Sequence, residues 1–262
     1  MSAEGKLAGR HALVTGAGSG IGAAIARALA AEGARVTLAG RRGEPLQALA
    51  ADLGENAFVA AGFDVTSPEA IAAGFAAARE KFGPVSVLVN NAGEAPTAPF
   101  EKTSLDMWNH VLSVDLTGVF LVTQAALPDL KAHGNVARII NIASTAGLTG
   151  YGYVSAYVAA KHGVVGLTRS LALELAKTGV TVNAVCPGFT DTPIIARSIE
   201  TIVAKTGRTP EQAMAEFTKS NPQGRLVRPE EVADTVIWLA SPNAASITGQ
   251  AIAVAGGEVL AG

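Results

Sequence analysis

The chain has 262 residues, with 20 Lys and Arg against 22 Asp and Glu, which gives a formal net charge of −2 at pH 7. Charged residues make up 16% of the chain and hydrophobic residues 49%, whereas an average soluble domain carries about 25% charged residues. This composition excludes an intrinsically disordered chain, which requires high charge and low hydrophobicity, and the balanced charge argues against a nucleic-acid-binding protein.

Short β-branched runs alternate along the chain with Ala- and Leu-rich stretches of helical period. We expect strands at 11–15, 35–38, 57–63, 85–89, 138–142, 181–185 and 250–254, and helices at 20–32, 44–53, 67–82, 104–131, 155–177 and 229–240. The strands are apolar on both faces, as a parallel sheet covered on both sides requires. The alternation predicts right-handed βαβ units in an α/β, doubly wound sheet. No linker or repeat divides residues 1–262, so we predict a single domain.

Residues 193–222 interrupt the regular alternation of strands and helices. The segment is mixed in charge and helical in places, and it begins just after a strand end. A lid over a binding site would lie at this position. We therefore predict a substrate lid over 193–222, with an ordinary long connection as the alternative.

The cysteine content and the apolar runs bear on the location of the protein. The single cysteine, Cys186, excludes an internal disulfide and a cysteine-based metal site, and it is typical of a reducing compartment. The N-terminus has no apolar core of signal-peptide length, and the most apolar stretches are interrupted by Arg, Glu or Gly. We expect a soluble cytoplasmic protein with no bound metal, no membrane contact and no nucleic-acid partner.

A glycine-rich turn follows the first strand and opens the first helix. It reads T-G-A-G-S-G-I-G over residues 15–22, with glycines at Gly16, Gly20 and Gly22. Glycines here allow a tight turn and a close approach of backbone N–H groups to a pyrophosphate. The N-terminus of the following helix adds partial positive charge for the anion. The turn therefore predicts a dinucleotide site.

The T-G-x-x-x-G-x-G spacing and four further motifs resemble the short-chain dehydrogenase/reductase family over nearly the whole chain. The four motifs are N-N-A-G at 90–93, Ser144 after the fifth strand, Y-V-A-A-K at 157–161, and Pro187-Gly188. The resemblance implies a seven-stranded, Rossmann-like parallel sheet, a nicotinamide cofactor and a homotetramer. Residues 161–189 look especially similar to polyketide ketoreductases and 3-hydroxyacyl-thioester dehydrogenases.

The end of the second strand bears on the choice of cofactor. In the family, an acidic residue here binds the ribose 2′-hydroxyl and selects NAD, whereas this chain has Gly40 followed by Arg41 and Arg42. A guanidinium can bind a 2′-phosphate bidentately. We expect NADP(H), with NAD(H) as the alternative if both arginines are solvated loop charges. By resemblance, the other cofactor contacts are Ser19, Ile21, Asp64, Val65, Asn91, Ala92, Gly93, Tyr157, Lys161, Pro187, Gly188, Thr190 and Thr192.

Three residues form the predicted catalytic set. Tyr157 and Lys161 are four positions apart, so a helix places both side chains on one face. Carbonyl reduction needs a proton donor at the oxygen, and a nearby Lys161 ammonium favours the tyrosinate form of Tyr157. The resemblance also implies a hydrogen bond from Lys161 to the nicotinamide ribose. Ser144, at the end of the fifth strand, can donate a hydrogen bond to the developing alkoxide.

One predicted catalytic position departs from the family pattern. The family often has V-N-x-x-G where this chain has V-D-L-T-G at 114–118, which places Asp115 in the position of the asparagine. In the family, that residue helps to hold a water that links the lysine to solvent, partly through its backbone carbonyl. A carboxylate near Lys161 would offset some of the effect of Lys161 on Tyr157. We therefore include Asp115 in the catalytic set and expect its side chain to influence the pH dependence.

These features together predict an oxidoreductase that transfers a hydride between a nicotinamide cofactor and a ketone or secondary alcohol. A 3-oxoacyl thioester or a small ketone is the favoured substrate. The alternatives are an NAD-dependent dehydrogenase of a cyclic alcohol or diol, and a non-catalytic dinucleotide-binding sensor. Tyr151 and Tyr153 are candidate pocket residues, and Cys186 is expected to be a packed thiol. The helices 104–131 and 155–177, which are poor in charge, and the last strand suit a homotetramer interface.

Overall fold

The computed structural model describes residues 5–260, which form a seven-stranded, wholly parallel sheet in the order β3-β2-β1-β4-β5-β6-β7. The strands are β1 (His11–Thr15), β2 (Arg35–Gly40), β3 (Ala57–Ala61), β4 (Val87–Asn90), β5 (Arg138–Ile142), β6 (Thr181–Pro187) and β7 (Ala251–Val254). The predicted doubly wound sheet is confirmed. The strand order reverses between β1 and β4, and ligands of such sheets bind outside the carboxyl ends of the strands at this point.

Apolar residues on both faces of the strands account for the two helical layers. In β1, Ala12 and Val14 pack into one hydrophobic cluster and Leu13 packs into another, because successive side chains of a strand point to opposite faces. All five residues of β1 are buried. A strand of this kind is stable only when helices cover both of its faces.

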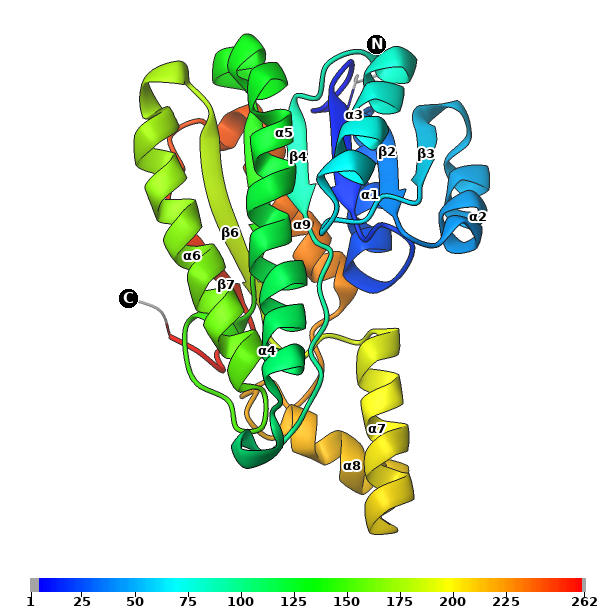
Figure 1. Cartoon of the computed structure of the whole chain (residues 1–262), viewed down its shortest axis with the longest axis vertical. Helices are drawn as coiled ribbons and strands as arrows, with labels where there is room; N and C mark the ends of the chain where they lie inside the picture. The colour runs from blue at the N-terminus through cyan, green and yellow to red at the C-terminus, as the bar shows by residue number, and fades with distance from the viewer. Residues whose placement is uncertain (1–4, 261–262) are drawn as a thin grey trace.

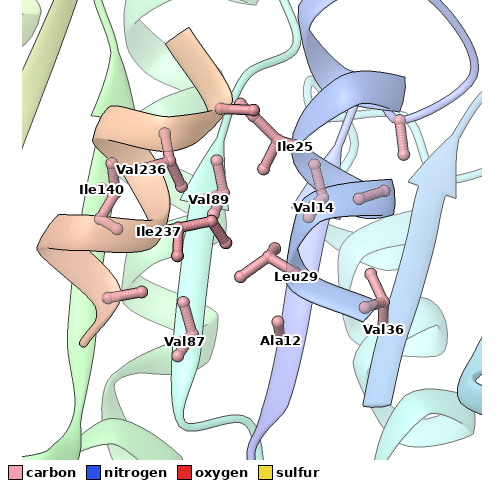
Figure 2. Packing of buried hydrophobic residues seen from close by; sticks show 14 of the residues in the cluster. Ala12, Val14, Ile25, Leu29, Val36, Val87, Val89, Ile140, Val236 and Ile237 are labelled. Carbon is pink, nitrogen blue, oxygen red and sulfur yellow. The ribbon is translucent and has the colours of Figure 1, made fainter. Parts of the chain in front are cut away.

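One face of the sheet is covered by α1 (Gly20–Ala31), α2 (Gly43–Leu53) and α9 (Pro229–Ala240). Figure 2 shows Ile25 and Leu29 of α1 and Ile237 of α9 packed over the strand residues Val14 and Val89. The other face is covered by α3 (Pro68–Phe82), α5 (Gly118–His133) and α6 (Ser155–Leu175), of which α5 and α6 lie in front of the sheet in Figure 1.

The helix preceding β5 differs from the predicted uninterrupted helix 104–131. It consists of α4 (Leu105–Leu112), a π-helical turn (Ser113–Thr117) and α5. By length and composition alone the stretch Leu105–Val136 is apolar enough to cross a membrane. In the fold, Val122, Ala126 and Leu130 of this stretch pack against the sheet as part of the core.

The predicted lid segment contains two helices, α7 (Pro193–Thr206) and α8 (Pro210–Thr218), which we call the α7–α8 arm. The arm lies beyond the carboxyl ends of the strands, at the lower edge of Figure 1. No residue of α7 is buried, and Ala213 is the single buried residue of α8. The arm therefore contributes little to the core and lies at the edge where a ligand of this fold binds.

Candidate active site

The glycine-rich turn joins β1 to α1 at the carboxyl edge of the sheet. Gly16 and Gly20 have φ angles of +65° and +53°, in the left-handed region that favours glycine. A Cβ on Gly22 would lie 2.3 Å from Gly16 O, so no other residue fits there without displacing the backbone. Ser19 precedes the first turn of α1 and is exposed, and Ile21 lies within that turn. The glycine cradle and the helix N-terminus suit a pyrophosphate.

Asn91 and Ala92, which follow β4, hold the glycine turn in place. Asn91 Nδ2 donates hydrogen bonds to Thr15 O (2.9 Å) and Gly16 O (3.2 Å). The backbone N–H groups of Asn91 and Ala92 donate to Thr15 Oγ1 at 2.9 and 3.0 Å. Two of the predicted cofactor residues therefore stabilise the glycine turn, because their hydrogen bonds join the end of β4 to the end of β1.

The end of β2 places positive charge at the same edge, and the end of β3 places Asp64 beside it. Arg41 and Arg42 follow β2, are exposed, and form no ion pair within residues 5–260. Two hydrogen bonds from Thr66 lower the pKa of Asp64 despite burial, and the nearby Arg41 guanidinium adds to the effect. Val65 is packed against Gly118 at the start of α5. Two guanidinium groups therefore lie free beside the predicted ribose site.

Lys161 and Asp115 form a buried ion pair at the centre of the site. Lys161 Nζ lies 3.5 Å from Asp115 Oδ2 and donates a hydrogen bond to Ile142 O at 3.1 Å. The Lys161 residue is 4% exposed and Asp115 is 0% exposed. Asp115 Oδ1 accepts the N–H of Glu94 at 3.0 Å, while Oδ2 has no hydrogen-bond partner in the described residues. The π-helical turn places Asp115 here, and such turns are frequent at functional sites.

Burial and charge act in opposite directions on Lys161. Burial alone would lower its pKa, but the Asp115 carboxylate and Tyr157 outweigh burial and raise the pKa. Burial raises the pKa of Asp115, and Lys161 and the Glu94 N–H offset this only in part. Lys161 therefore remains an ammonium in the folded chain, held by a carboxylate that is itself costly to bury.

The two other predicted catalytic residues adjoin this pair. Tyr157 lies in the first turns of α6, and Lys161 Nζ is 5.4 Å from the centroid of its ring. Ser144 follows β5, and its Oγ accepts the N–H of Ala146 at 3.1 Å. The bond from Lys161 to Ile142 O joins α6 to β5 two residues before Ser144. Lys161 is thus in contact with both Asp115 and Tyr157, and Ser144 follows two residues after the Ile142 carbonyl that Lys161 binds.

The segment after β6 forms the opposite side of the cofactor site. Thr190 Oγ1 donates a hydrogen bond to Gly188 O at 2.9 Å, which fixes the turn that follows Pro187. A Cβ on Gly20 would lie 3.2 Å from Thr192 Cγ2, so Thr192 faces the glycine turn. Gly93 also adjoins the ion pair, since a Cβ on it would lie 2.9 Å from Asp115 Oδ2. The predicted cofactor residues therefore converge from five strand ends.

Two side-chain contacts of the site were absent from the sequence prediction, and the structure also shows the exposure of two residues that were in it. Glu94 Oε1 pairs with His110 Nε2 at 2.6 Å in the last turn of α4, and Tyr151 contacts Glu258 near the C-terminus. Tyr153, a candidate pocket residue, is 70% exposed. Cys186 is buried, and burial raises the pKa of its thiol to about 11, as expected for a packed thiol. None of the contacts of Glu94 or Glu258 has a sequence signal, because each depends on tertiary packing.

A glycine cradle at the strand-order reversal, with a buried lysine and a tyrosine on one helix beside it, defines a dinucleotide-dependent oxidoreductase of the Rossmann type. The model of the family described as enoyl-(acyl carrier protein) reductase matches residues 16–258. The chain belongs to the short-chain dehydrogenase/reductase family and is an NAD(P)-dependent enzyme.

Individual relatives and a solved structure are similar to this chain over nearly its whole length. The chain is 46% identical over 252 residues to a protein of Streptomyces coelicolor assigned as a ketoacyl reductase, covering 94% of this chain and 95% of that one. It is 39% identical over 254 residues to a D-beta-hydroxybutyrate dehydrogenase of Rhizobium meliloti, covering 95% and 98%. The crystal structure of F189W actinorhodin polyketide ketoreductase with NADPH superposes with a TM-score of 0.90 at 44% identity, covering 95% of this chain and 97% of that one.

Proposed function

We propose that this enzyme uses NADPH to reduce the ketone of a 3-oxoacyl thioester or a similar small ketone. The observation that carries the proposal is the buried Lys161 ammonium beside Tyr157, at the end of the strand that carries Ser144. The likeness to a protein assigned as a ketoacyl reductase and to a polyketide ketoreductase supports the substrate class. This arrangement argues against a non-catalytic sensor, which has no need of a buried charged pair beside the tyrosine.

The residues of the carboxyl edge fit the cofactor. The glycine cradle would hold the pyrophosphate, the exposed Arg41 and Arg42 would bind the ribose 2′-phosphate, and the segment after Pro187 would pack on the nicotinamide. Asp64 and Val65 would border the adenine at the end of β3. A bound NADPH supplies the hydride for the carbonyl carbon. The free guanidinium groups, with no carboxylate at the Gly40 position, favour NADP(H) over NAD(H).

The side chains of the site supply a proton to the carbonyl oxygen and stabilise the negative charge that remains. The Tyr157 hydroxyl gives its proton to the carbonyl oxygen as negative charge develops there. The Ser144 hydroxyl donates a hydrogen bond to the same oxygen. The Lys161 ammonium stabilises the phenolate that remains, and Asp115 holds Lys161 in position at 3.5 Å. Asp115 is a positioning residue, because it contacts Lys161 and the Glu94 N–H.

We propose that the α7–α8 arm is a lid over the substrate. Its place at the carboxyl edge and its lack of buried residues in α7 support this role. Within the arm, Glu216 contacts both Arg208 and Lys219, so these charges balance one another on an exposed surface.

We also propose that the enzyme is a homotetramer in a reducing compartment, the cytoplasm. Leu173 of α6 is 84% exposed and Phe120 of α5 is 46% exposed, so large apolar groups lie on the outer faces of the two helices expected at the interface. The free, buried Cys186 suits a reducing compartment. Light scattering at micromolar concentration should give four times the chain mass, and a monomer would contradict the assembly.

A substrate panel run with both cofactors tests the proposed reaction. We expect NADPH oxidation with 3-oxobutanoyl-N-acetylcysteamine, and kcat lower by about 10²–10⁴ in Tyr157→Phe, because the proton donor is lost. The dissociation constant of NADPH for this variant should stay within about threefold of the unmodified enzyme. Turnover of cyclic alcohols with NAD alone would favour the dehydrogenase alternative, and no turnover of any substrate would favour the sensor.

A further inference from the structure

Glu258 lies four residues beyond β7 and contacts two segments that are distant in the sequence. Its Oε1 accepts a hydrogen bond from the Tyr151 hydroxyl at 2.8 Å and another from the Ser220 hydroxyl at 2.7 Å. Tyr151 belongs to the loop that follows Ser144, and Ser220 follows α8 of the arm. A single carboxylate therefore ties the C-terminal segment to the catalytic loop and to the base of the predicted lid.

The same carboxylate borders the reacting centre. The Tyr151 hydroxyl is also 2.8 Å from Thr145 Oγ1, next to Ser144 in the chain. A Cβ on Gly188 would lie 2.7 Å from Glu258 Oε2, so the second carboxylate oxygen faces the segment expected to pack on the nicotinamide. Glu258 therefore lies between the loop that follows Ser144 and the turn after β6.

The surroundings of Glu258 are apolar or neutral. The Tyr151 ring packs edge-on against Phe189 with centroids 5.8 Å apart, and Phe189 packs against Phe217 of α8 at 5.2 Å. Burial raises the pKa of Tyr151 to about 12; Thr145 partly offsets this, and Glu258 and then Tyr157 reinforce it. Tyr151 therefore stays protonated and serves as a neutral donor to the carboxylate.

No cation neutralises Glu258 within residues 5–260. The salt bridges of this part of the molecule use other acids, since Arg208 and Lys219 contact Glu216 and Arg225 contacts Glu231. A substrate in this region would therefore meet a carboxylate that no cation pairs with and that the Tyr151 and Ser220 hydroxyls hold. Glu258 is half-buried, so its charge is screened less than that of a fully exposed carboxylate.

We propose that Glu258 is a specificity-determining residue, whose carboxylate disfavours ketones that carry a free carboxylate and favours neutral esters and thioesters. The inference rests on the proposed function and narrows its substrate class. The expected preference for neutral substrates differs from that of relatives such as the D-beta-hydroxybutyrate dehydrogenase, whose named substrate is a carboxylic acid. Repulsion between like charges is a common way to reject a competing ligand.

Matched substrates test this role. We would measure kcat/KM with NADPH for 3-oxobutanoate, which is an anion, and for its neutral N-acetylcysteamine thioester. The unmodified enzyme should favour the thioester by at least about tenfold, equivalent to about 1.4 kcal/mol. Glu258→Gln keeps the size and a hydrogen-bonding oxygen but removes the charge, so it should reduce this ratio at least about fivefold through a rise in kcat/KM for the acid.

Two controls separate charge from structure. Glu216→Gln removes a carboxylate from the exposed face of α8 and should leave the ratio unchanged. Tyr151→Phe breaks the hydrogen bond but keeps the Glu258 charge, so it should preserve the preference for the neutral substrate. A ratio in Glu258→Gln within twofold of the unmodified enzyme, or an equal shift in Glu216→Gln, would overturn the inference.

A binding measurement keeps the inference testable without turnover. NMR titrations with butanoate and methyl butanoate in the presence of NADPH use ligands that have no ketone to reduce. The unmodified enzyme should bind the ester more tightly than the acid, and Glu258→Gln should narrow the difference. If the enzyme reduces neither ketone but shows this pattern, the proposed reaction fails and the specificity role stands. If it reduces the thioester but the pattern is absent, the specificity role fails alone.

Discussion

Backbone forms the cofactor side of the active site, whereas side chains form the side proposed to meet the substrate. The cofactor side is made by backbone, with Gly16, Gly20 and Gly22 in one short turn that Asn91 ties to β4. The side proposed to meet the substrate is made by side chains from segments far apart in the chain; these are Tyr151, Phe189, Phe217, Ser220 and Glu258. The first depends on local chain geometry, whereas the second depends on how distant segments meet.

This difference predicts how each side tolerates substitution. A new Cβ at Gly22 would lie 2.3 Å from a backbone oxygen, and backbone cannot rotate away as a side chain can. A changed side chain on the substrate side leaves the strands and turns in place. Substitutions on the cofactor side should therefore abolish nucleotide binding, while those on the substrate side should alter the choice of substrate.

The largest effect is expected for Gly22→Val. The branched side chain cannot fit against Gly16 O, so NADPH binding should weaken by more than about 100-fold, about 2.7 kcal/mol. Fluorescence titration of NADPH measures this, with circular dichroism to check the fold. Gly150→Ala is the matched control, because a Cβ there meets no atom within 4 Å and binding should not change. Unaltered binding by Gly22→Val would refute the backbone-built cradle.

A smaller effect is expected from the double variant Arg41→Ala/Arg42→Ala. A hydrogen bond to a charged group contributes about 1.5–3 kcal/mol, so the loss of one such contact with the 2′-phosphate should raise KM for NADPH about 10–100-fold while KM for NADH stays the same. Steady-state kinetics with both cofactors measures the change. Arg35→Ala, at the opposite end of β2, removes a guanidinium far from the site and serves as control. Equal changes for NADPH and NADH would exclude a 2′-phosphate contact.

The smallest effect is expected for Asp115→Asn. Asp115 acts on both sides of the site, because it contacts Lys161. The pKa of Lys161 is raised in the folded chain, so the Lys161 ammonium contributes stability at neutral pH that is lost only as pH rises through that folded value. Without the Asp115 charge, burial lowers the pKa of Lys161, so the ammonium that supports the Tyr157 phenolate is lost at lower pH. The basic limb of the pH–kcat profile should move to lower pH by about one unit, without loss of activity near neutral pH.

Asp106→Asn provides the control for this variant. Asp106 is exposed in the first turn of α4, in the same helical stretch as Asp115. Its substitution should leave the pH–kcat profile in place. A pH–kcat profile for Asp115→Asn identical to that of the unmodified enzyme would show that the carboxylate has no effect on the pH dependence.

The sequence predicted the cofactor side better than the substrate side, and the reason is physical. Strand His11–Thr15 and helix Pro229–Ala240 have the predicted bounds, because apolar periodicity and flanking glycine or proline are local signals. The π-helical turn around Asp115 was missed, since an i→i+5 turn carries no distinctive composition. The contact of Tyr151 with Glu258 spans 107 positions and arises only from packing.

The most direct test of this contrast is the dissociation constant of NADPH for Tyr151→Phe, measured by fluorescence titration beside Gly22→Val. Tyr151 contacts Thr145, Glu258 and Phe189, and none of these contacts involves the glycine turn. The dissociation constant for Tyr151→Phe should therefore lie within about twofold of the unmodified enzyme, about 0.4 kcal/mol, while Gly22→Val loses binding. A tenfold weaker affinity in Tyr151→Phe would contradict a cofactor side that is built independently of the substrate side.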